Sequence, residues 1–178
     1  MATYQDIRGL RVKYLSADPS NTATGEVWYN STTGTLRSQI ISAAWSSGSP
    51  ITTARFNMGS GDTPNTAAII FGGTGKSILT EEFDGSGWST GGNMGTGRYA
   101  LPGFGTQTTA VGAGGYASPA PGNKALVEEY NGSTWSEETN IPTPQRGSAS
   151  FGSLTAGVIA GGVGTTANLD TSYEYDGT

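Results

Sequence analysis

Residues 128–136 read EEYNGSTWS, and residues 81–89 read EEFDGSGWS. A shorter version, YEYDG, occupies residues 173–177. In each stretch an acid and an aromatic residue precede Asn-Gly or Asp-Gly, the dipeptides that most favour a tight hairpin turn. The sequence therefore predicts an antiparallel strand pair that recurs three times.

Further landmarks recur in the same order around these stretches. Tryptophans spaced by 43 and 47 residues are each followed by serine, an arginine comes 10 or 11 residues later, and a double glycine follows the arginine. Self-similarity at such a period is typical of repeat architectures. We place the units at 46–88, 89–135 and 136–178, the last truncated before its tryptophan. The landmark residues are Trp45, Trp88, Trp135, Arg55, Arg98, Arg146, Gly72, Gly73, Gly114, Gly115, Gly161 and Gly162.

Each unit predicts four antiparallel strands. A small-residue strand follows the arginine, and a short apolar strand such as 67–71 or 110–113 ends at the double glycine, because glycine tolerates positive φ and close backbone approach. The third strand ends at the acid and aromatic residue, and the fourth starts at the tryptophan. The expected fold class is all-β.

The order of these landmarks resembles the kelch repeat over residues 46–178, including the Pro-containing segment 141–145 before Arg146. The resemblance implies β-propeller blades, and the high Gly, Thr and Ala content is similar to degenerate kelch-like arrays of marine bacteriophage proteins. Two complete units and one truncated unit are fewer than the four to eight blades of a closed ring. We therefore expect either that the chain continues past Thr178 or that copies associate.

Residues 1–45 do not repeat and predict a hairpin, with arms 27–29 and 35–37 and a five-residue loop between them. This stretch is similar to segments of phage tail-fibre and virion proteins. The resemblance implies a virion anchor and a trimeric homo-oligomer. Alternatively, the hairpin only caps the first unit. The anchoring residues implied are Val27, Trp28, Tyr29, Leu36 and Arg37.

Composition excludes several classes of chemistry. The chain of 178 residues has no Cys and no His, which removes thiol nucleophiles, disulfides and imidazole bases. The net charge is −5, and residues 38–178 hold five basic against eleven acidic residues, which argues against a nucleic-acid partner. No apolar run approaches the ~20 residues of a membrane span, and the N-terminus lacks a signal-peptide pattern. We expect assembly in a host cytoplasm, no membrane insertion and no cofactor.

Three motifs carry alternative interpretations. Residues 71–77 end like a phosphate-binding loop but lack its first glycine and a following helix, so nucleotide binding is not predicted. Adjacent acids on a strand point to opposite faces, so they do not form a catalytic pair. We expect Glu82, Glu129 and Glu174 to pair with the repeated arginines or with backbone amides between units. The repeated aromatics predict packing between units rather than a sugar platform. Ligand contacts are expected from the loops 61–65, 75–77 and 117–123.

The function predicted is that of a bacteriophage virion structural protein, such as a tail fibre, without enzyme activity and without catalytic or metal-binding residues. Its partners would be other virion proteins and a host-surface glycan or receptor. A cellular kelch-type protein–protein interaction module is the first alternative. A glycan-active propeller enzyme is the second.

Overall fold

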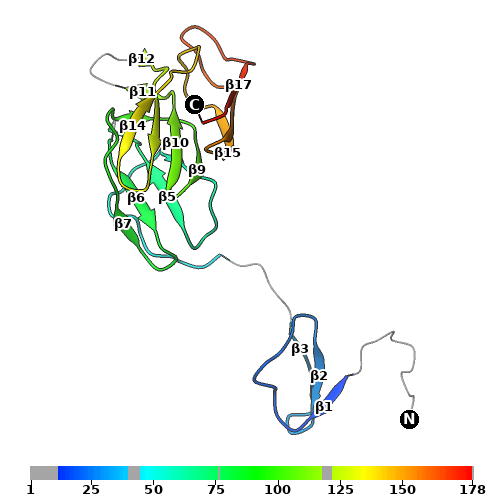
Figure 1. Cartoon of the computed structure of the whole chain (residues 1–178). Helices are drawn as coiled ribbons and strands as arrows, with labels where there is room; N and C mark the ends of the chain where they lie inside the picture. The colour runs from blue at the N-terminus through cyan, green and yellow to red at the C-terminus, as the bar shows by residue number, and fades with distance from the viewer. Residues whose placement is uncertain (1–11, 40–44, 76, 118–121, 178) are drawn as a thin grey trace. The chain divides into compact units, whose positions relative to one another are not determined.

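The computed structural model describes residues 12–39, 45–75, 77–117 and 122–177, and these residues contain strands, turns and irregular segments but no helix. The expected all-β class is therefore confirmed. No helix in this part of the chain is long and apolar enough to cross a membrane. The chain divides into two compact units, residues 1–47 and residues 48–178, which we call the N-terminal unit and the repeat unit (Figure 1).

The N-terminal unit contains the predicted hairpin, formed by β2 (Val27–Asn30) and β3 (Thr35–Ser38). A strand that the sequence did not indicate, β1 (Lys13–Leu15), pairs parallel to β2. The carboxylate of Asp18 joins the parts: it accepts hydrogen bonds from Asn30 Nδ2 and Trp28 Nε1, both at 2.9 Å, and pairs with Arg37 at 2.9 Å. These hydrogen bonds hold the pKa of Asp18 below its ordinary value. Trp28 is buried, whereas Leu36 is exposed.

The described residues of the repeat unit form four antiparallel sheets. In three of them, which we call the first, second and third sheets, the strands pair in chain order. In the described residues the third sheet has three strands, and the fourth sheet is a small one of two-residue strands. The first sheet contains β4 (Gly59–Ser60), β5 (Ala68–Phe71), β6 (Thr80–Phe83) and β7 (Trp88–Thr90). The second contains β9 (Gly103–Thr106), β10 (Thr109–Ala113), β13 (Val127–Tyr130) and β14 (Trp135–Glu138). The third contains β15 (Ala149–Ser153), β16 (Ala156–Ala160) and β17 (Ser172–Tyr175), and the small sheet β8 (Arg98–Tyr99), β11 (Tyr116–Ala117) and β12 (Gly122–Asn123).

The sheets pack face to face through two apolar clusters. The first and second sheets approach each other closely at Gly103, which has no side chain. A Cβ atom added there would lie 2.5 Å from the Phe71 ring and 2.8 Å from the Ser60 carbonyl oxygen. A larger residue at Gly103 would therefore push the first two sheets apart. The cluster between the first two sheets contains Ile69, Phe71, Met94, Leu101, Ala110 and Tyr130 with Trp135 against it. The next cluster contains Phe104, Val111, Ala113, Val127 and Ile159.

Trp88 and Trp135 occupy equivalent corners of successive sheets. Each lies opposite the aromatic residue of the preceding strand, with ring centroids 5.1 Å apart in both Phe83–Trp88 and Tyr130–Trp135. Trp45 has no such aromatic partner among the residues that the structure describes. It lies in no strand, and its side chain is fully exposed at 104 %.

Hydrogen bonds of one kind join each sheet to the next. The Tyr130 hydroxyl donates to Glu82 Oε1 at 2.5 Å, and the Tyr175 hydroxyl donates to Glu129. Burial, and then the adjacent carboxylate, raise the pKa of Tyr130 above its ordinary value, so the hydroxyl stays a donor. The second acid of each predicted pair therefore connects its sheet to the following one.

Replacing Tyr130 with Phe tests this connection. We expect Tyr130→Phe to lower the free energy of unfolding by about 1.5–3 kcal/mol, because a hydrogen bond to a charged acceptor is lost while the ring remains. Urea denaturation followed by tryptophan fluorescence measures the change. Tyr99→Phe is the control, since the Tyr99 hydroxyl makes no hydrogen bond to any described residue. Equal stability of the two variants would contradict the prediction.

Candidate functional site

Two of the repeated arginines form buried ion pairs with glutamates of the first and second sheets. Arg55 pairs with Glu81, and Arg98 Nη2 lies 2.5 Å from Glu128 Oε2, with all four side chains at most 2 % exposed. Arg98 also donates to the carbonyl oxygens of Gly114 and Leu126, each at 2.6 Å. Each arginine thus connects the end of the second strand, at the double glycine, to the third strand.

The pairing expected for Glu82 and Glu129 is wrong by one residue in each sheet. Successive side chains on a strand point to opposite faces, so only one acid of each pair can reach the arginine. That acid is the first one, and the second faces the tyrosine of the next sheet. Glu174 is exposed and forms no ion pair with any described residue.

The buried carboxylate of Glu81 depends on these donors. Burial raises its pKa, but hydrogen bonds from Arg55 and Thr52 outweigh burial, and its pKa lies below the ordinary value. Its contribution to stability is therefore present above the ordinary carboxyl pKa, and is lost as the pH falls through the lower folded-state value.

In the third sheet the structural counterpart of Arg55 and Arg98 is Gln145, not Arg146. The amide of Gly73 donates to the Arg98 carbonyl, and the equivalent amide of Gly115 donates to the Gln145 carbonyl, both at 2.8 Å. Two residues after each of the three positions the backbone has positive φ, at Asn57, Ala100 and Gly147. The sequence assignment of Arg146 to this position is wrong by one residue, because a basic residue stands beside the true one.

The third sheet has lost both charges of the ion pair together. Tyr173 stands where Glu81 and Glu128 stand in the earlier sheets, and its hydroxyl donates to Thr143 Oγ1 at 2.9 Å. Gln145 is fully buried and donates to Ser148 Oγ at 3.1 Å. Because a buried charge without its partner is strongly destabilising, a neutral residue at one position requires a neutral residue at the other.

Arg146 therefore occupies the position next to the buried one, where the earlier units have Phe56 and Tyr99. Its guanidinium lies over the Tyr116 ring at 5.1 Å and donates to Asn123 Oδ1 at 3.0 Å. The rings of Tyr99 and Tyr116 are 5.3 Å apart, and Phe56 is 63 % exposed. We call the four side chains Phe56, Tyr99, Tyr116 and Arg146 the aromatic rim; two of them lie on β8 and β11 of the small sheet.

Two hollows open beside the aromatic rim. One, of about 340 Å³, is bordered by Tyr116, Asn123, Arg146 and the loop 163–168. The other, of about 520 Å³, is bordered by Phe56, Thr74, Gly75 and Tyr99. Flat aromatic faces and a cation with spare donors suit a ring-shaped ligand that carries hydroxyl or acidic groups.

The loops expected to contact a ligand lie in different places. Gly75, Gly122 and Asn123 border the hollows, whereas Lys76 and residues 118–121 lie outside the described residues. The loop 61–65 is engaged elsewhere, since Asp62 accepts a hydrogen bond from the Gly152 amide at 3.0 Å. The rim aromatics were missed, although Phe56 and Tyr99 follow the arginine directly and Tyr116 follows the double glycine.

The phosphate-loop resemblance at 71–77 leads into β6 and not into a helix. The described residues contain no group of three or more His, Cys, Asp or Glu that could hold a metal ion.

The fold defines an all-β protein built from consecutive antiparallel sheets packed face to face (Figure 1). A solved structure of the protein YjhT is similar to it, with a TM-score of 0.61 and 10 % sequence identity. The match covers 83 % of this chain and 48 % of that one, so the chain spans about half the length of its structural neighbour. At this identity the likeness shows the fold alone. No protein-family model and no curated protein matches the sequence.

Transplanting the neutral pair of the third sheet into the second tests the charge argument. We expect Arg98→Gln or Glu128→Tyr alone to lower the free energy of unfolding by about 3–5 kcal/mol, because each single variant leaves a buried charge without its partner. The double variant R98Q/E128Y should cost much less than the sum, since Thr96 stands where Thr143 accepts from Tyr173. A double-mutant cycle by urea denaturation measures the coupling. Additive effects would contradict the argument, and Glu137→Gln on the exposed side of β14 is the control.

Proposed function

We propose that this chain is a non-enzymatic binding module built from kelch-like propeller blades, and that it serves as a structural and attachment protein of a bacteriophage virion. The N-terminal unit would dock on other virion proteins. The aromatic rim of the repeat unit would bind a host-surface glycan. The observation that carries the proposal is this rim, in which Phe56, Tyr99 and Arg146 lie at equivalent positions of successive units and Tyr116 lies beside two of them.

The repeat unit supports the propeller assignment. The first and second sheets each run from an inner strand beside the next sheet to an outer strand that begins with tryptophan. Inner strands contact each other, as where Ser150 Oγ donates to the Gly103 carbonyl at 2.8 Å. The fold likeness to YjhT is consistent with this arrangement.

The acids of the sheets support a non-enzymatic role. Glu81 and Glu128 neutralise arginines, and Glu82 and Glu129 accept from tyrosines, so these carboxylates are engaged in holding the sheets. The rim itself carries stacking faces and a guanidinium, and the described residues that border its two hollows include no Asp, Glu or Lys.

The virion setting rests on the resemblance of residues 25–37 to virion proteins. The hairpin belongs to a compact unit separate from the sheets, as a docking element would. Trp28, Asn30 and Arg37 are fixed through Asp18, which leaves Leu36 as an exposed apolar contact for a virion partner.

An array of bacterial lipopolysaccharides and capsular polysaccharides tests the binding proposal. We expect the protein to bind acidic glycans, and Tyr116→Ala to weaken binding about tenfold, because a lost stacking face is worth about 1.4 kcal/mol. Phe151→Ala is the matched control, an exposed aromatic on β15 outside the rim. Equal loss in both variants would contradict a role for the rim. Glycan turnover would favour the enzyme alternative.

Mass spectrometry of gradient-purified phage particles tests the virion setting. We expect peptides of this chain in particles of the phage that encodes it, at several copies per particle. Recovery from host-cell fractions but not from particles would favour a cellular kelch-type interaction module.

A further inference from the structure

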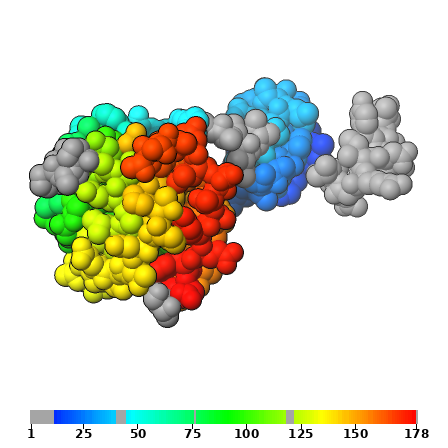
Figure 2. All heavy atoms as spheres, turned by 90° about the horizontal axis from the view of Figure 1, so that it is seen from above, coloured from blue at the N-terminus to red at the C-terminus, as the bar shows by residue number. Residues whose placement is uncertain are grey.

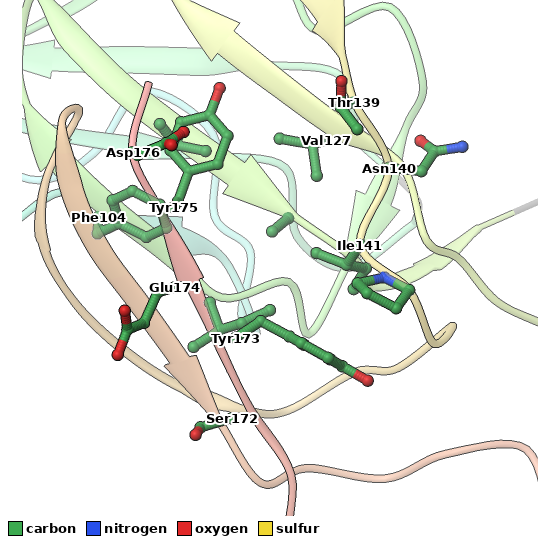
Figure 3. A pocket seen from close by; sticks show the side chains of 14 residues that line it. Phe104, Val127, Thr139, Asn140, Ile141, Ser172, Tyr173, Glu174, Tyr175 and Asp176 are labelled. Atoms are coloured by element: carbon green, nitrogen blue, oxygen red, sulfur yellow. The ribbon is translucent and has the colours of Figure 1, made fainter. Parts of the chain in front are cut away.

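A hollow of about 480 Å³ lies between the second and third sheets. Its lining includes Ala113, Val127, Ile141 and Tyr175 (Figure 3). It is largely apolar, and β17 forms one of its walls. In Figure 2 the residues near the C-terminus, drawn in red, lie at the surface of the repeat unit, so this wall faces outward.

At the junction between the first and second sheets, the corresponding space is filled by the Trp135 indole. The ring packs edge-on against Phe71 at 4.8 Å and against Tyr130 at 5.1 Å, and its Nε1 donates to Thr80 Oγ1 at 2.9 Å. Met94 belongs to the same cluster. The units can be aligned by their double glycines, their tryptophans and their Asn-Gly or Asp-Gly turns. In this alignment each of the four residues around Trp135 has a counterpart one unit later: Ala113 for Phe71, Tyr175 for Tyr130, Val127 for Thr80 and Ile141 for Met94. All four line the hollow.

The strand that would carry a tryptophan into this hollow is not among the described strands of the third sheet. In the first two sheets the third strand pairs with a fourth that begins at Trp88 or Trp135. In the third sheet β17 is an edge, which pairs with β16 alone among the described strands. An open edge beside an apolar hollow is a template for an added strand.

The segment beginning at Trp45 has the sequence of such a strand and pairs with no strand among the described residues of its own chain. Trp45 is followed by serine and lies 10 residues before Arg55, as Trp88 lies 10 residues before Arg98. Its side chain is fully exposed. We propose that the segment Trp45–Gly48 of a second copy pairs with β17 as a fourth strand and places its indole in the hollow, head to tail.

The earlier sheets fix the register of this pairing. Trp88 lies opposite Phe83 and Ser89 opposite Glu82, and Trp135 and Ser136 repeat the arrangement with Tyr130 and Glu129. Trp45 of the second copy therefore lies opposite Tyr175, and Ser46 lies opposite Glu174.

Two copies close this arrangement into a ring. The described residues of each copy supply three blade-like sheets, so two head-to-tail junctions give six blades, within the usual four to eight, whereas the trimer implied by the fibre resemblance would give nine. The matched part of this chain covers 48 % of YjhT, so its neighbour holds about twice as much chain, the amount that two copies provide. The inference rests on the equivalence of the sheets and not on the proposed glycan or virion role.

Light scattering of the full chain coupled to size exclusion tests the inference. We expect twice the chain mass of 18.2 kDa, and the mass of one chain for Trp45→Ala. Leu36→Ala, which removes another exposed apolar side chain of the N-terminal unit, should leave the dimer intact. A wild-type monomer or trimer, or a dimeric W45A, would overturn the inference. Glycan binding by W45A tests the rim separately.

Cross-linking tests the register, because the natural chain has no cysteine. Directly opposed residues on paired strands have Cβ atoms within disulfide reach. A mixture of the S46C and E174C variants should form a disulfide-linked heterodimer under mild oxidation, whereas S46C with T165C, in the exposed segment 165–168, should not. Equal yields from both mixtures would overturn the proposed pairing.

Discussion

A charge buried in a sheet of this protein requires an opposite charge at hydrogen-bonding distance, and this requirement organises each unit. Arg98, with a side-chain exposure of 0 %, meets Glu128 and also holds the carbonyl at the double glycine. The same side chain thus neutralises the carboxylate on β13 and fixes the end of β10. The next residue, Glu129, faces the following sheet and accepts a hydrogen bond from the Tyr175 hydroxyl. The ion pair with the buried arginine and the hydrogen bond to the next sheet are therefore consequences of two adjacent glutamates on one strand.

The double glycines connect this interior to the surface. All six have positive φ. In the first two pairs the amide of the second glycine, Gly73 or Gly115, donates to the carbonyl of the buried Arg98 or Gln145 of the next unit. The residue after each of these positions is then directed to the rim. Since the backbone there is fixed by hydrogen bonds, the rim side chain can change from Phe56 to Tyr99 to Arg146 without disturbing the sheets. A constant interior thus presents a variable surface.

Much of the fold follows from the sequence because it depends on local signals. The Asn-Gly and Asp-Gly turns, the double glycines and the Trp88 and Trp135 strands are where the pattern places them. The errors concern contacts between strands. Which of two adjacent acids meets an arginine depends on the sheet face, and Arg146 could be told from Gln145 only by the backbone hydrogen bond to Gly115. The strand β1 was missed because its short, exposed sequence has no period. The rim was missed because single aromatics after a landmark form no motif.

The neutral Gln145 and Tyr173 pair has a consequence for how such arrays diversify. A lineage in which the Arg–Glu pair is replaced by Gln–Tyr has to pass through an intermediate with one buried charge that lacks its partner, unless both codons change almost together. Whole-unit duplication or recombination, which exchanges both positions at once, avoids that intermediate. Units of this kind are therefore expected to spread as intact cassettes, while the rim positions between them drift one residue at a time.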